Sequence, residues 1–285
     1  GTTVELQKEL SEKGINPYQY DTTCPFVEKV WNRAAQIGER GYSIIVHGKP
    51  EHEETRATFS HSKENTPTVV VKDMADAQKL AFYIRKEKTS EQFFEEFSGK
   101  YSVNFDPQKD LERIGVVNQT TMLATETQAI ADYLKEQIIA YRNISELESQ
   151  AYFANTRDTL CYATNDNQEA TYGLMQTPAD IAVVVGGYNS SNTTHLVELL
   201  VQKMPTYFIR NADCLNSKTS VSSFDIHKKS EIFETTFLPE KSQITVSLTC
   251  GASCPDSIFE EVMVKLLSFF EISNEMISQK ILELK

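Results

Sequence analysis

The stretch IAVVVGGYNSSNTTHLVELLVQK, residues 181–203, combines a strand, a turn and a helix in direct succession. It opens with a continuous run of mostly β-branched apolar residues, passes through a turn rich in glycine, serine and asparagine, and continues as an amphipathic helix. An apolar strand without alternating polar residues is typical of a sheet that is covered on both faces. A helix directly after such a strand is typical of a βα unit in a parallel sheet. The stretch therefore predicts an α/β fold.

Three further segments follow the same plan and show how the chain is divided. They are YSIIVHG (42–48), IGVVNQ (114–119) and ITVSLT (244–249), each followed by a turn and a helical pattern. The four units form two groups, and each group opens with the pattern Asp-Thr-x-Cys, at residues 21–24 and 158–161. A sequence pattern that recurs in this way is expected of a repeated module. We therefore expect two pseudo-symmetric βαβ domains with parallel sheets, at residues 24–157 and 158–270.

The remaining segments lie outside these units. Residues 1–23 hold a helical pattern that ends at Gly14, and the chain opens without a methionine. We therefore expect them to be the end of a largely missing N-terminal domain. Residues 72–113 are rich in charge and are expected to form an insertion of helices and loop on the surface of the first domain. Residues 271–285 are expected to form a C-terminal tail.

Composition and charge exclude several classes of partner. The 285 residues are 40% hydrophobic, which is enough for a sizeable core, and carry a formal net charge of -12. An acidic chain is a poor match for a nucleic-acid backbone or an anionic membrane. The longest apolar run, residues 181–185, is far too short to span a bilayer. We expect a soluble protein without a nucleic-acid or membrane partner.

The five cysteines are too few and too scattered for a disulfide framework, which indicates a reducing compartment. Their possible roles are packed thiols, a nucleophile or metal ligands. Cys24 and Cys161 each stand at the predicted start of a helix, a position that favours the thiolate form. Two thiolates from two domains suit a shared cluster better than a zinc site with close Cys spacing. A cysteine nucleophile remains open.

The turns after the strands are candidate anion sites, because ligands collect at the carboxyl ends of parallel strands, where helix N-termini offer free N–H groups. YNSSNTT and CGASCPD lie at such ends, and QTT occupies residues 119–121. Ordinary helix caps would explain these residue types equally well. Taken together, the turns favour a phosphate or diphosphate cradle. Neither a Walker motif nor GxGxxG occurs in the sequence, so a nucleotide is not the leading ligand. The candidate donors are Ser190, Ser191, Asn192, Ser253, Gln119 and Thr120.

The stretch HGKPEHEETRATFSHS, residues 47–62, gathers histidines and carboxylates directly after a strand. His52 and Glu54 stand where a proton donor would be wanted. A zinc site is one alternative, although the spacing does not match the helical HExxH pattern. A solvated, charged helix start is another, because Glu53 and Glu54 would be stabilised by the helix dipole.

Six motifs resemble, in order and spacing, those of one known family. They are DTTCPFVEKVW, YSIIVHGKPEHEETRAT, VVNQTTM, DTLCYATNDNQEA, VVVGGYNSSNTTHL and TCGASCPD. The family is that of the LytB-type 4-hydroxy-3-methylbut-2-enyl diphosphate reductases, and the segment before FDPQKDLERIGVVNQTTM looks like its plant and cyanobacterial branch. The resemblance implies a three-domain, trefoil-like enzyme around a central cleft, of which this chain would be the last two domains.

The resemblance also implies a cofactor and site residues. Family enzymes hold a 4Fe–4S cluster with three cysteines, and Cys24 and Cys161 match two of them. The third belongs to a GFC motif in the domain that is missing here, so the cluster is expected to be labile or absent. Glu54 matches a proton-delivering glutamate and Thr120 a threonine beside it. The remaining matches are substrate-binding positions, with two of them (Gln119 and Ser191) in supporting roles: His52, Gln119, Thr164, Ser190, Ser191, Asn192 and Ser253.

The implied reaction is the reductive dehydroxylation of an allylic diphosphate to isopentenyl and dimethylallyl diphosphates. Electrons would come from a ferredoxin or flavodoxin, in a bacterial cytoplasm or a plastid stroma. Asn167 departs from the family, which usually has arginine there, and Cys250 and Cys254 replace small residues. We expect these two cysteines to be packed thiols, with a substitute cluster ligand as the alternative. Two rival functions remain: a non-catalytic diphosphate- or partner-binding fragment, and a zinc hydrolase that uses His52, Glu54 and a cysteine.

Overall fold

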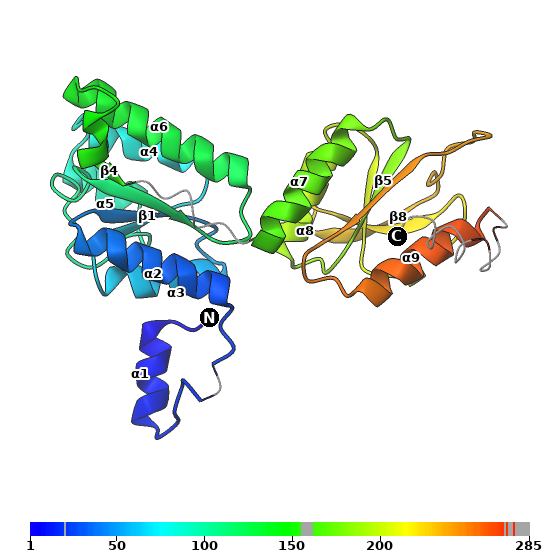
Figure 1. Ribbon diagram of the computed structural model, residues 1–285, viewed down its shortest axis with the longest axis horizontal. Helices are drawn as coiled ribbons and strands as arrows, with labels where there is room; N and C mark the ends of the chain where they lie inside the picture. Colours follow the sequence, from blue (N-terminus) through cyan, green and yellow to red (C-terminus); the bar gives the residue numbers. More distant parts are fainter. Residues whose placement is uncertain (20, 155–161, 271, 273–275, 277–285) are drawn as a thin grey trace. The chain divides into compact units, whose positions relative to one another are not determined.

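The computed structural model describes residues 1–19, 21–154, 162–270, 272 and 276. The chain forms two compact units, Gly1–Tyr162 and Ala163–Lys285, each with its own sheet (Figure 1). The boundary predicted at residue 158 lies outside the described residues. No helix in the described part of the chain combines the length and the apolar character that crossing a bilayer requires.

The first unit is built on a four-stranded parallel sheet in the order β2-β1-β3-β4. All four strands are buried, so the continuous apolar runs do mark strands covered on both faces. In the register of the central strands, His47 pairs with Val71 on one side and Asn118 on the other. The strands are β1 (Ser43–His47), β2 (Thr68–Val71), β3 (Ile114–Asn118) and β4 (Phe153–Ala154).

Two pairs of helices cover this sheet, one pair on each face (Figure 1). Alternate β1 residues divide between them: Ile44 packs with the α2 side and Ile45 with the α4 and α6 side. The pairs are α2 (Pro25–Glu39) with α3 (Glu53–Lys63), and α4 (Met74–Ile84) with α6 (Ala124–Arg142). The first helix, α1 (Val4–Glu12), contacts α3 and buries none of its own residues.

The prediction that residues 72–113 form a surface insertion is wrong for much of this segment. Helix α4 completes a βα unit with β2, and α5 (Ser90–Glu96) is followed by residues that enter the core. Phe93 stacks on Phe97 and Phe105 at centroid distances of 5.0 and 5.1 Å, and all three rings are buried. The many charged residues dominate the sequence pattern of this segment and obscure its aromatic core residues, because the charges face solvent while the rings cover the sheet.

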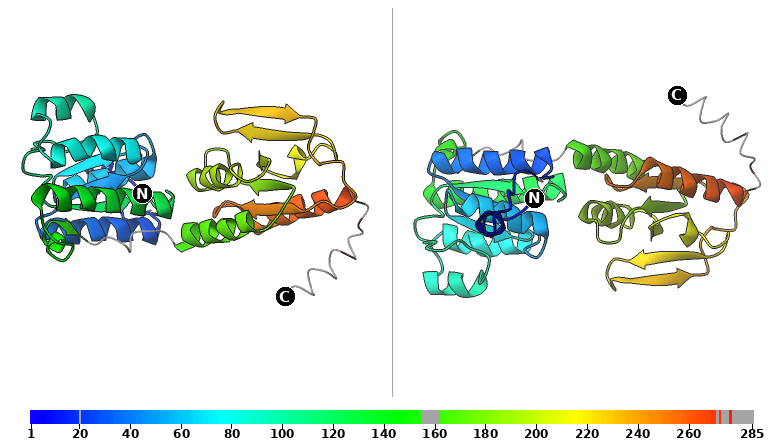
Figure 2. Two further views of the ribbon diagram at one scale, coloured as in Figure 1. Left: turned by 90° about the horizontal axis from the view of Figure 1, so that it is seen from above. Right: turned by 90° about the horizontal axis from the view of Figure 1, so that it is seen from below.

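The second unit has a three-stranded parallel sheet in the order β6-β5-β9. Helices α7 and α8 pack on one face, and α9 packs on the other. A two-stranded antiparallel ribbon, β7 with β8, is added after β6 (Figure 2). The elements are α7 (Tyr162–Gln176), β5 (Ile181–Val185), α8 (Ser191–Leu200), β6 (Thr206–Ile209), β7 (Val221–Asp225), β8 (Ser230–Glu234), β9 (Val246–Cys250) and α9 (Asp256–Ser268), with 3₁₀ turns at Glu148–Ala151 in the first unit and Ala212–Cys214 in the second.

The expected α/β class with parallel sheets and βαβ units is confirmed, and the two units repeat one topology. In each, the first long strand is central, the next strand pairs on one side and a later strand on the other. A helix precedes each central strand, α2 before β1 and α7 before β5. Cys24 is the N-cap of α2. Cys161 directly precedes α7 in the sequence but lies outside the described residues.

Three segments of the second unit meet at one closely packed point. A Cβ atom on Gly251, after β9, would lie 2.0 Å from Oγ1 of Thr193 on α8, and one on Gly186, after β5, would lie 2.7 Å from the same atom. Thr193 is fully buried, and a β-branched side chain has little rotamer freedom in a helix. Both positions therefore require glycine, and the turn after β9 is held against the start of α8.

Gly251→Ala should lower the free energy of unfolding of the second unit by roughly 1–3 kcal/mol, because the new methyl group overlaps a side chain that cannot move away. Amide hydrogen exchange in β5 and α8 would measure the loss. Gly173→Ala on α7, where nothing lies within 4 Å of the added Cβ, is the matched control and should be neutral or slightly stabilising. Thr193→Ala should relieve part of the effect in the double variant. Equal protection of wild type and Gly251→Ala would contradict the close contact.

Candidate functional site

The first candidate site lies at the carboxyl edge of the first unit's sheet. Because His47 pairs with Asn118, the loops after β1 and β3 begin side by side. The N–H of Gln119 continues the ladder by donating to the His47 carbonyl at 2.8 Å. Carboxyl edges of parallel strands are where α/β proteins collect ligands. The structure thus brings together the residues that the sequence placed in two separate motifs.

The buried side chain of Gln119 ties these loops to each other. Its Oε1 accepts from the Lys49 N–H at 3.2 Å and from the Thr55 hydroxyl at 2.9 Å, and its Nε2 donates to Thr121 Oγ1 at 2.6 Å. Gly48 allows this approach, because a Cβ there would lie 2.4 Å from Thr55 Oγ1. The Gln119 amide is therefore engaged within the protein, which agrees with a supporting rather than a ligand-contacting position.

Glu54 and Thr120 form the chemical centre of this edge. Glu54 lies in the first turn of α3, and its Oε1 accepts a hydrogen bond from the Thr120 N–H. Burial raises the pKa of the Glu54 carboxyl, and the hydrogen bonds from the Thr120 backbone and side chain partly oppose that rise. A carboxyl group with a raised pKa keeps its proton to higher pH, as a proton donor requires.

His52 caps the helix that carries Glu54. Its Nδ1 accepts from the Glu54 N–H at 3.2 Å, so the neutral ring carries its hydrogen on Nε2. Burial lowers the pKa of His52, the nearby Lys49 lowers it further, and Glu53 acts in the opposite direction. The ring is therefore neutral near pH 7 and offers a single N–H donor beside the carboxyl group.

The other histidines of this stretch have structural partners. Buried His47 places Nδ1 2.8 Å from Thr127 Oγ1, and His61 stacks on Trp31 at 3.6 Å between ring centroids. Among the described residues no three His, Cys, Asp or Glu side chains are grouped to hold a metal ion. The zinc hydrolase built on His52 and Glu54 therefore lacks a ligand set in this part of the chain.

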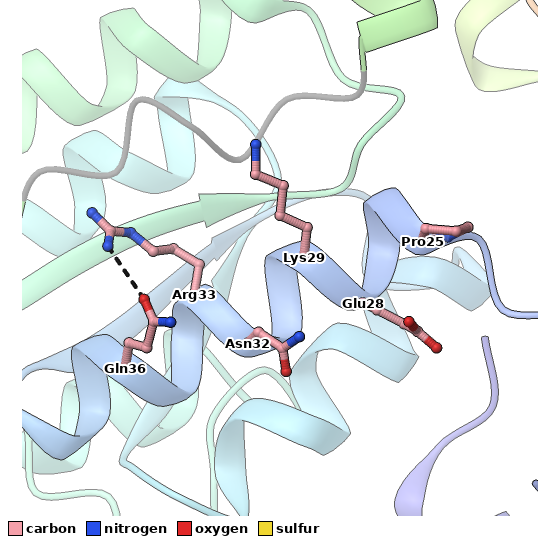
Figure 3. A pocket seen from close by; sticks show the side chains of 6 residues that line it. All are labelled: Pro25, Glu28, Lys29, Asn32, Arg33 and Gln36. Carbon is pink, nitrogen blue, oxygen red and sulfur yellow. Dashed lines mark hydrogen bonds between the residues drawn. The ribbon is translucent and has the colours of Figure 1, made fainter.

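Cys24 lies at the N-terminus of α2 with an exposed, free thiol that makes no capping hydrogen bond. An accessible sulfur at the start of a helix is free to contact a group outside the helix. A hollow of ≈340 Å³ lies along the same helix, and none of the predicted site residues lines it. Figure 3 shows the side chains that do. The hollow is formed by Pro25, Glu28, Lys29, Asn32, Arg33 and Gln36.

The second unit places its candidate donors at the start of α8. Ser190 is the N-cap, and its Oγ accepts from the Thr193 N–H at 3.3 Å. Ser191 and Asn192 follow in the first turn and are buried. Both amide atoms of Asn192, which is 3% exposed, have no hydrogen-bond partner among the residues that the structure describes. A buried, unsatisfied amide at a helix N-terminus points to a ligand that completes its hydrogen bonds.

The turn after β9 adjoins this helix start through the contact of Gly251 with Thr193. Ser253 is exposed in that turn, where its hydroxyl is available to a ligand. Asn167, whose role was open from its sequence motif, donates from Nδ2 to the Cys250 carbonyl at 3.1 Å and so connects α7 to the end of β9. Thr164 is buried on α7. Thr193 was not predicted as a site residue, although it extends the serine and asparagine run.

The predicted site residues thus form two sets in two units. His52, Glu54 and Thr120 gather with Gln119 in the first, and Ser190, Ser191 and Asn192 gather in the second. Cys250 and Cys254 are half-buried and pack against the hydrophobic cluster beneath α9. Burial raises the pKa of the Cys250 thiol to about 11 and also raises that of Cys254.

Comparison with known proteins gives a consistent result over nearly the whole chain. The model of the family described as LytB protein matches residues 1–267. A 4-hydroxy-3-methylbut-2-enyl diphosphate reductase from Cyanothece is 36% identical over 278 residues, which are 97% of this chain and 66% of the relative. The enzyme of that name from Synechocystis is 38% identical over 272 residues, 95% of this chain and 69% of the relative. The chain therefore spans about two thirds of the length of these relatives.

One solved structure supports the fold. A structure described as the E-1-hydroxy-2-methyl-but-2-enyl-4-diphosphate reductase from Plasmodium falciparum superimposes with a TM-score of 0.60 at 21% identity. The match covers 94% of this chain and 65% of that one. At this level of identity the similarity extends to the arrangement of the strands and helices.

Two buried amides should respond oppositely to replacement by leucine, which has nearly the same shape. Gln119→Leu should lower the free energy of unfolding of the first unit by roughly 1–3 kcal/mol, because Thr55 and the Lys49 N–H lose their acceptor. Asn192→Leu should leave the second unit as stable or more stable, because an unsatisfied amide is removed. Fluorescence of Trp31 reports the first unit, and hydrogen exchange in α8 reports the second. Destabilisation of the ligand-free second unit by Asn192→Leu would refute the unsatisfied amide.

The stability of the first unit should depend on the protonation of Glu54. The folded-state pKa of Glu54 is raised above its ordinary value of 4.5, so the stabilising effect of its proton is complete below that value and is lost as the pH rises through the folded-state pKa. Glu54→Gln stays neutral and keeps an acceptor for the Thr120 N–H. The free energy of unfolding of Glu54→Gln relative to that of wild type, measured with denaturant, should therefore increase between about pH 4 and pH 7. The exposed neighbour Glu53→Gln should show no such growth, and parallel pH curves for Glu54→Gln and wild type would exclude the burial effect.

Proposed function

This chain belongs to the LytB protein family, and from that premise we propose that it carries the chemistry of a 4-hydroxy-3-methylbut-2-enyl diphosphate reductase. In this reaction two electrons and two protons are added, the allylic hydroxyl group leaves as water, and isopentenyl and dimethylallyl diphosphates are formed. The observation that carries the proposal is the half-buried Glu54 carboxyl group, with its raised pKa, beside Thr120 at the carboxyl edge of the sheet.

Glu54 is proposed to supply a proton to the substrate. Its raised pKa keeps the carboxyl group protonated further into the neutral range than an exposed glutamate. Thr120 orients it, because the Thr120 N–H donates to Oε1 and the Thr120 side chain also hydrogen-bonds to the carboxyl group. His52, with Nδ1 engaged by the Glu54 N–H, offers Nε2–H to an anionic part of the substrate. Gln119 holds the two loops in register.

The N-terminal turn of α8 is proposed to bind the diphosphate. The free N–H groups of the helix start and the Ser190 hydroxyl are neutral donors, and such donors bind phosphate oxygens without a lysine clamp. Asn192 supports this assignment, because a phosphate oxygen would satisfy its buried Nδ2. Ser253 is proposed to add a hydroxyl from the adjoining turn, with Ser191 and Thr164 in supporting positions.

Cys24 and Cys161 are proposed to hold an iron–sulfur cluster of the 4Fe–4S type. The exposed Cys24 thiol at the start of α2 is suited to that role, and Cys161 precedes the corresponding helix of the second unit. When bound, such a cluster supplies a Lewis-acidic iron and a route for single electrons. A third cysteine ligand is expected from outside this sequence.

The partners and location follow from the same proposal. The substrate is a small allylic diphosphate, and the electron donor is a ferredoxin or flavodoxin. We propose a bacterial cytoplasm or a plastid stroma as the compartment, where reduced thiols persist. The net charge of -12 does not by itself attract an acidic donor, so the docking surface must lie where positive side chains gather.

Iron and sulfide analysis of protein purified without oxygen tests the proposal. A brown protein that contains both elements and converts the allylic alcohol diphosphate with a one-electron chemical reductant is the expected result. A colourless, iron-free protein that still binds inorganic pyrophosphate would indicate a non-catalytic diphosphate-binding fragment. Failure to bind pyrophosphate in either form would overturn the role of the α8 turn.

Glu54→Gln should lower turnover by roughly 100-fold or more while leaving binding of the diphosphate nearly unchanged, because the amide cannot deliver a proton. Product formation by the iron-loaded protein measures the first effect, and calorimetric titration with inorganic pyrophosphate measures the second. The exposed neighbour Glu53→Gln is the matched control and should keep both properties. Turnover by Glu54→Gln at the wild-type rate would remove Glu54 from its role.

A further inference from the structure

Two thiols flank the short turn between β9 and α9. Cys250 is the last residue of β9, and Cys254 precedes Pro255, the N-cap of α9. The N–H of Cys254 donates to the Gly251 carbonyl at 2.9 Å, which closes a four-residue turn. Such a turn brings its first and last Cα atoms, here those of Gly251 and Cys254, within about 7 Å. The chain therefore turns back at Cys254 toward the residue that directly follows Cys250.

The two side chains share one environment and contact each other. Both are free, both are half-buried, and both pack against the hydrophobic cluster that Val262 and Leu266 of α9 help to form. Their thiols interact directly, with the Cys250 S–H donating to the Cys254 sulfur. Burial raises the pKa of both thiols. The hydrogen bond raises the pKa of Cys250 further and partly offsets the rise for Cys254. Cys254 is therefore the first of the pair to become thiolate.

Cys214 shows how an inert packed thiol differs from this pair. It is buried, and its sulfur contacts Asn211 Oδ1 at 3.6 Å and the Tyr188 hydroxyl at 3.8 Å. Neither neighbour can form a covalent bond with it. Cys250 and Cys254 are accessible to small reagents, and each has a sulfur as its neighbour. A disulfide between them requires Cα atoms about 4.4–6.8 Å apart.

We propose that Cys250 and Cys254 form a reversible disulfide across the turn of residues 251–253. The Cys254 thiolate attacks one sulfur of a small-molecule disulfide such as oxidised glutathione, which releases one glutathione thiol and leaves a mixed disulfide. Cys250 loses its proton to solvent and attacks the Cys254 sulfur, which releases the second glutathione. Two protein thiols are oxidised while one disulfide is reduced to two thiols, and a dithiol reductant reverses the exchange.

The turn that this disulfide would constrain is joined to the proposed diphosphate site. Gly251 packs against Thr193 in the first turn of α8, Ser253 is a proposed donor, and the Cys250 carbonyl accepts from Asn167. This part of the inference rests on the proposed function. A covalent bond between the ends of the turn leaves Ser253 less able to adjust to a ligand, so the oxidised protein should bind diphosphate more weakly.

Mass spectrometry tests the disulfide independently of any activity. Trypsin cleaves after Lys241 and Lys265 and releases both cysteines in one peptide. After treatment with oxidised glutathione and alkylation, this peptide should have lost two hydrogen atoms and carry no alkyl group; dithiothreitol should restore two alkylated thiols. The rate should rise about tenfold per pH unit below the thiol pKa, because thiolate is the attacking form.

Matched variants identify the pair. Cys214→Ser should form the disulfide as wild type does, whereas Cys250→Ser should stop at the mixed disulfide on Cys254. A wild-type peptide that keeps two alkylated cysteines after oxidation would overturn the proposal, as would glutathione retained on both.

Calorimetric titration of the reduced and oxidised forms with inorganic pyrophosphate tests the link to the site. Severalfold weaker binding by the oxidised form is expected, and reduction should reverse it. Equal binding by both forms would refute the link. If the disulfide forms but neither form of the protein binds pyrophosphate, the proposed diphosphate site is refuted and the proposed disulfide is supported.

Discussion

The parallel pairing of β1 with β3 is the interaction on which the first candidate site depends. Its register sets His47 beside Asn118, so two loops that are far apart in the sequence leave the sheet together. Gln119 then bonds to the loop after β1, and Thr120 meets Glu54. A shift of one residue would exchange the two faces of the strand and separate these partners. The chemistry of Glu54 is therefore a consequence of strand register.

The two units differ in whether a buried side-chain amide is hydrogen-bonded within the protein. Gln119 is fully buried and bonded on both its oxygen and its nitrogen, which makes the edge of the first sheet rigid before any ligand arrives. Asn192 is just as inaccessible to water, and its amide has no partner within the described residues. An unsatisfied buried amide costs stability, and a bound anion would recover that cost. The first unit therefore satisfies its buried amide within the protein, while the second leaves one to which a ligand is proposed to bind.

Repetition of one topology gives the two units comparable positions for different tasks. The helix before each central strand starts next to a cysteine, and the turn after that strand leads into a helix N-terminus. In the first unit this turn carries His52 and Glu54, and in the second it carries Ser190 and Asn192. The same backbone plan therefore presents a histidine and a carboxyl group in one copy and neutral hydroxyl and amide groups in the other, because loop residues can change without disturbing the buried strands.

The sequence by itself determined the βα units, the parallel sheets and the residue types at their carboxyl ends. The strands at 43–47, 114–118 and 181–185 are mostly apolar and are each followed by a short turn and a helix, so the local pattern was sufficient. It failed at residues 72–113, where exposed charges masked Phe93 and Phe105 as core residues. Only the tertiary structure shows that Gln119 connects two loops, that Asn192 has no hydrogen-bond partner among the described residues and that Asn167 bonds to the end of β9. Hydrogen-bond satisfaction depends on which distant segments meet, and no local pattern contains that information.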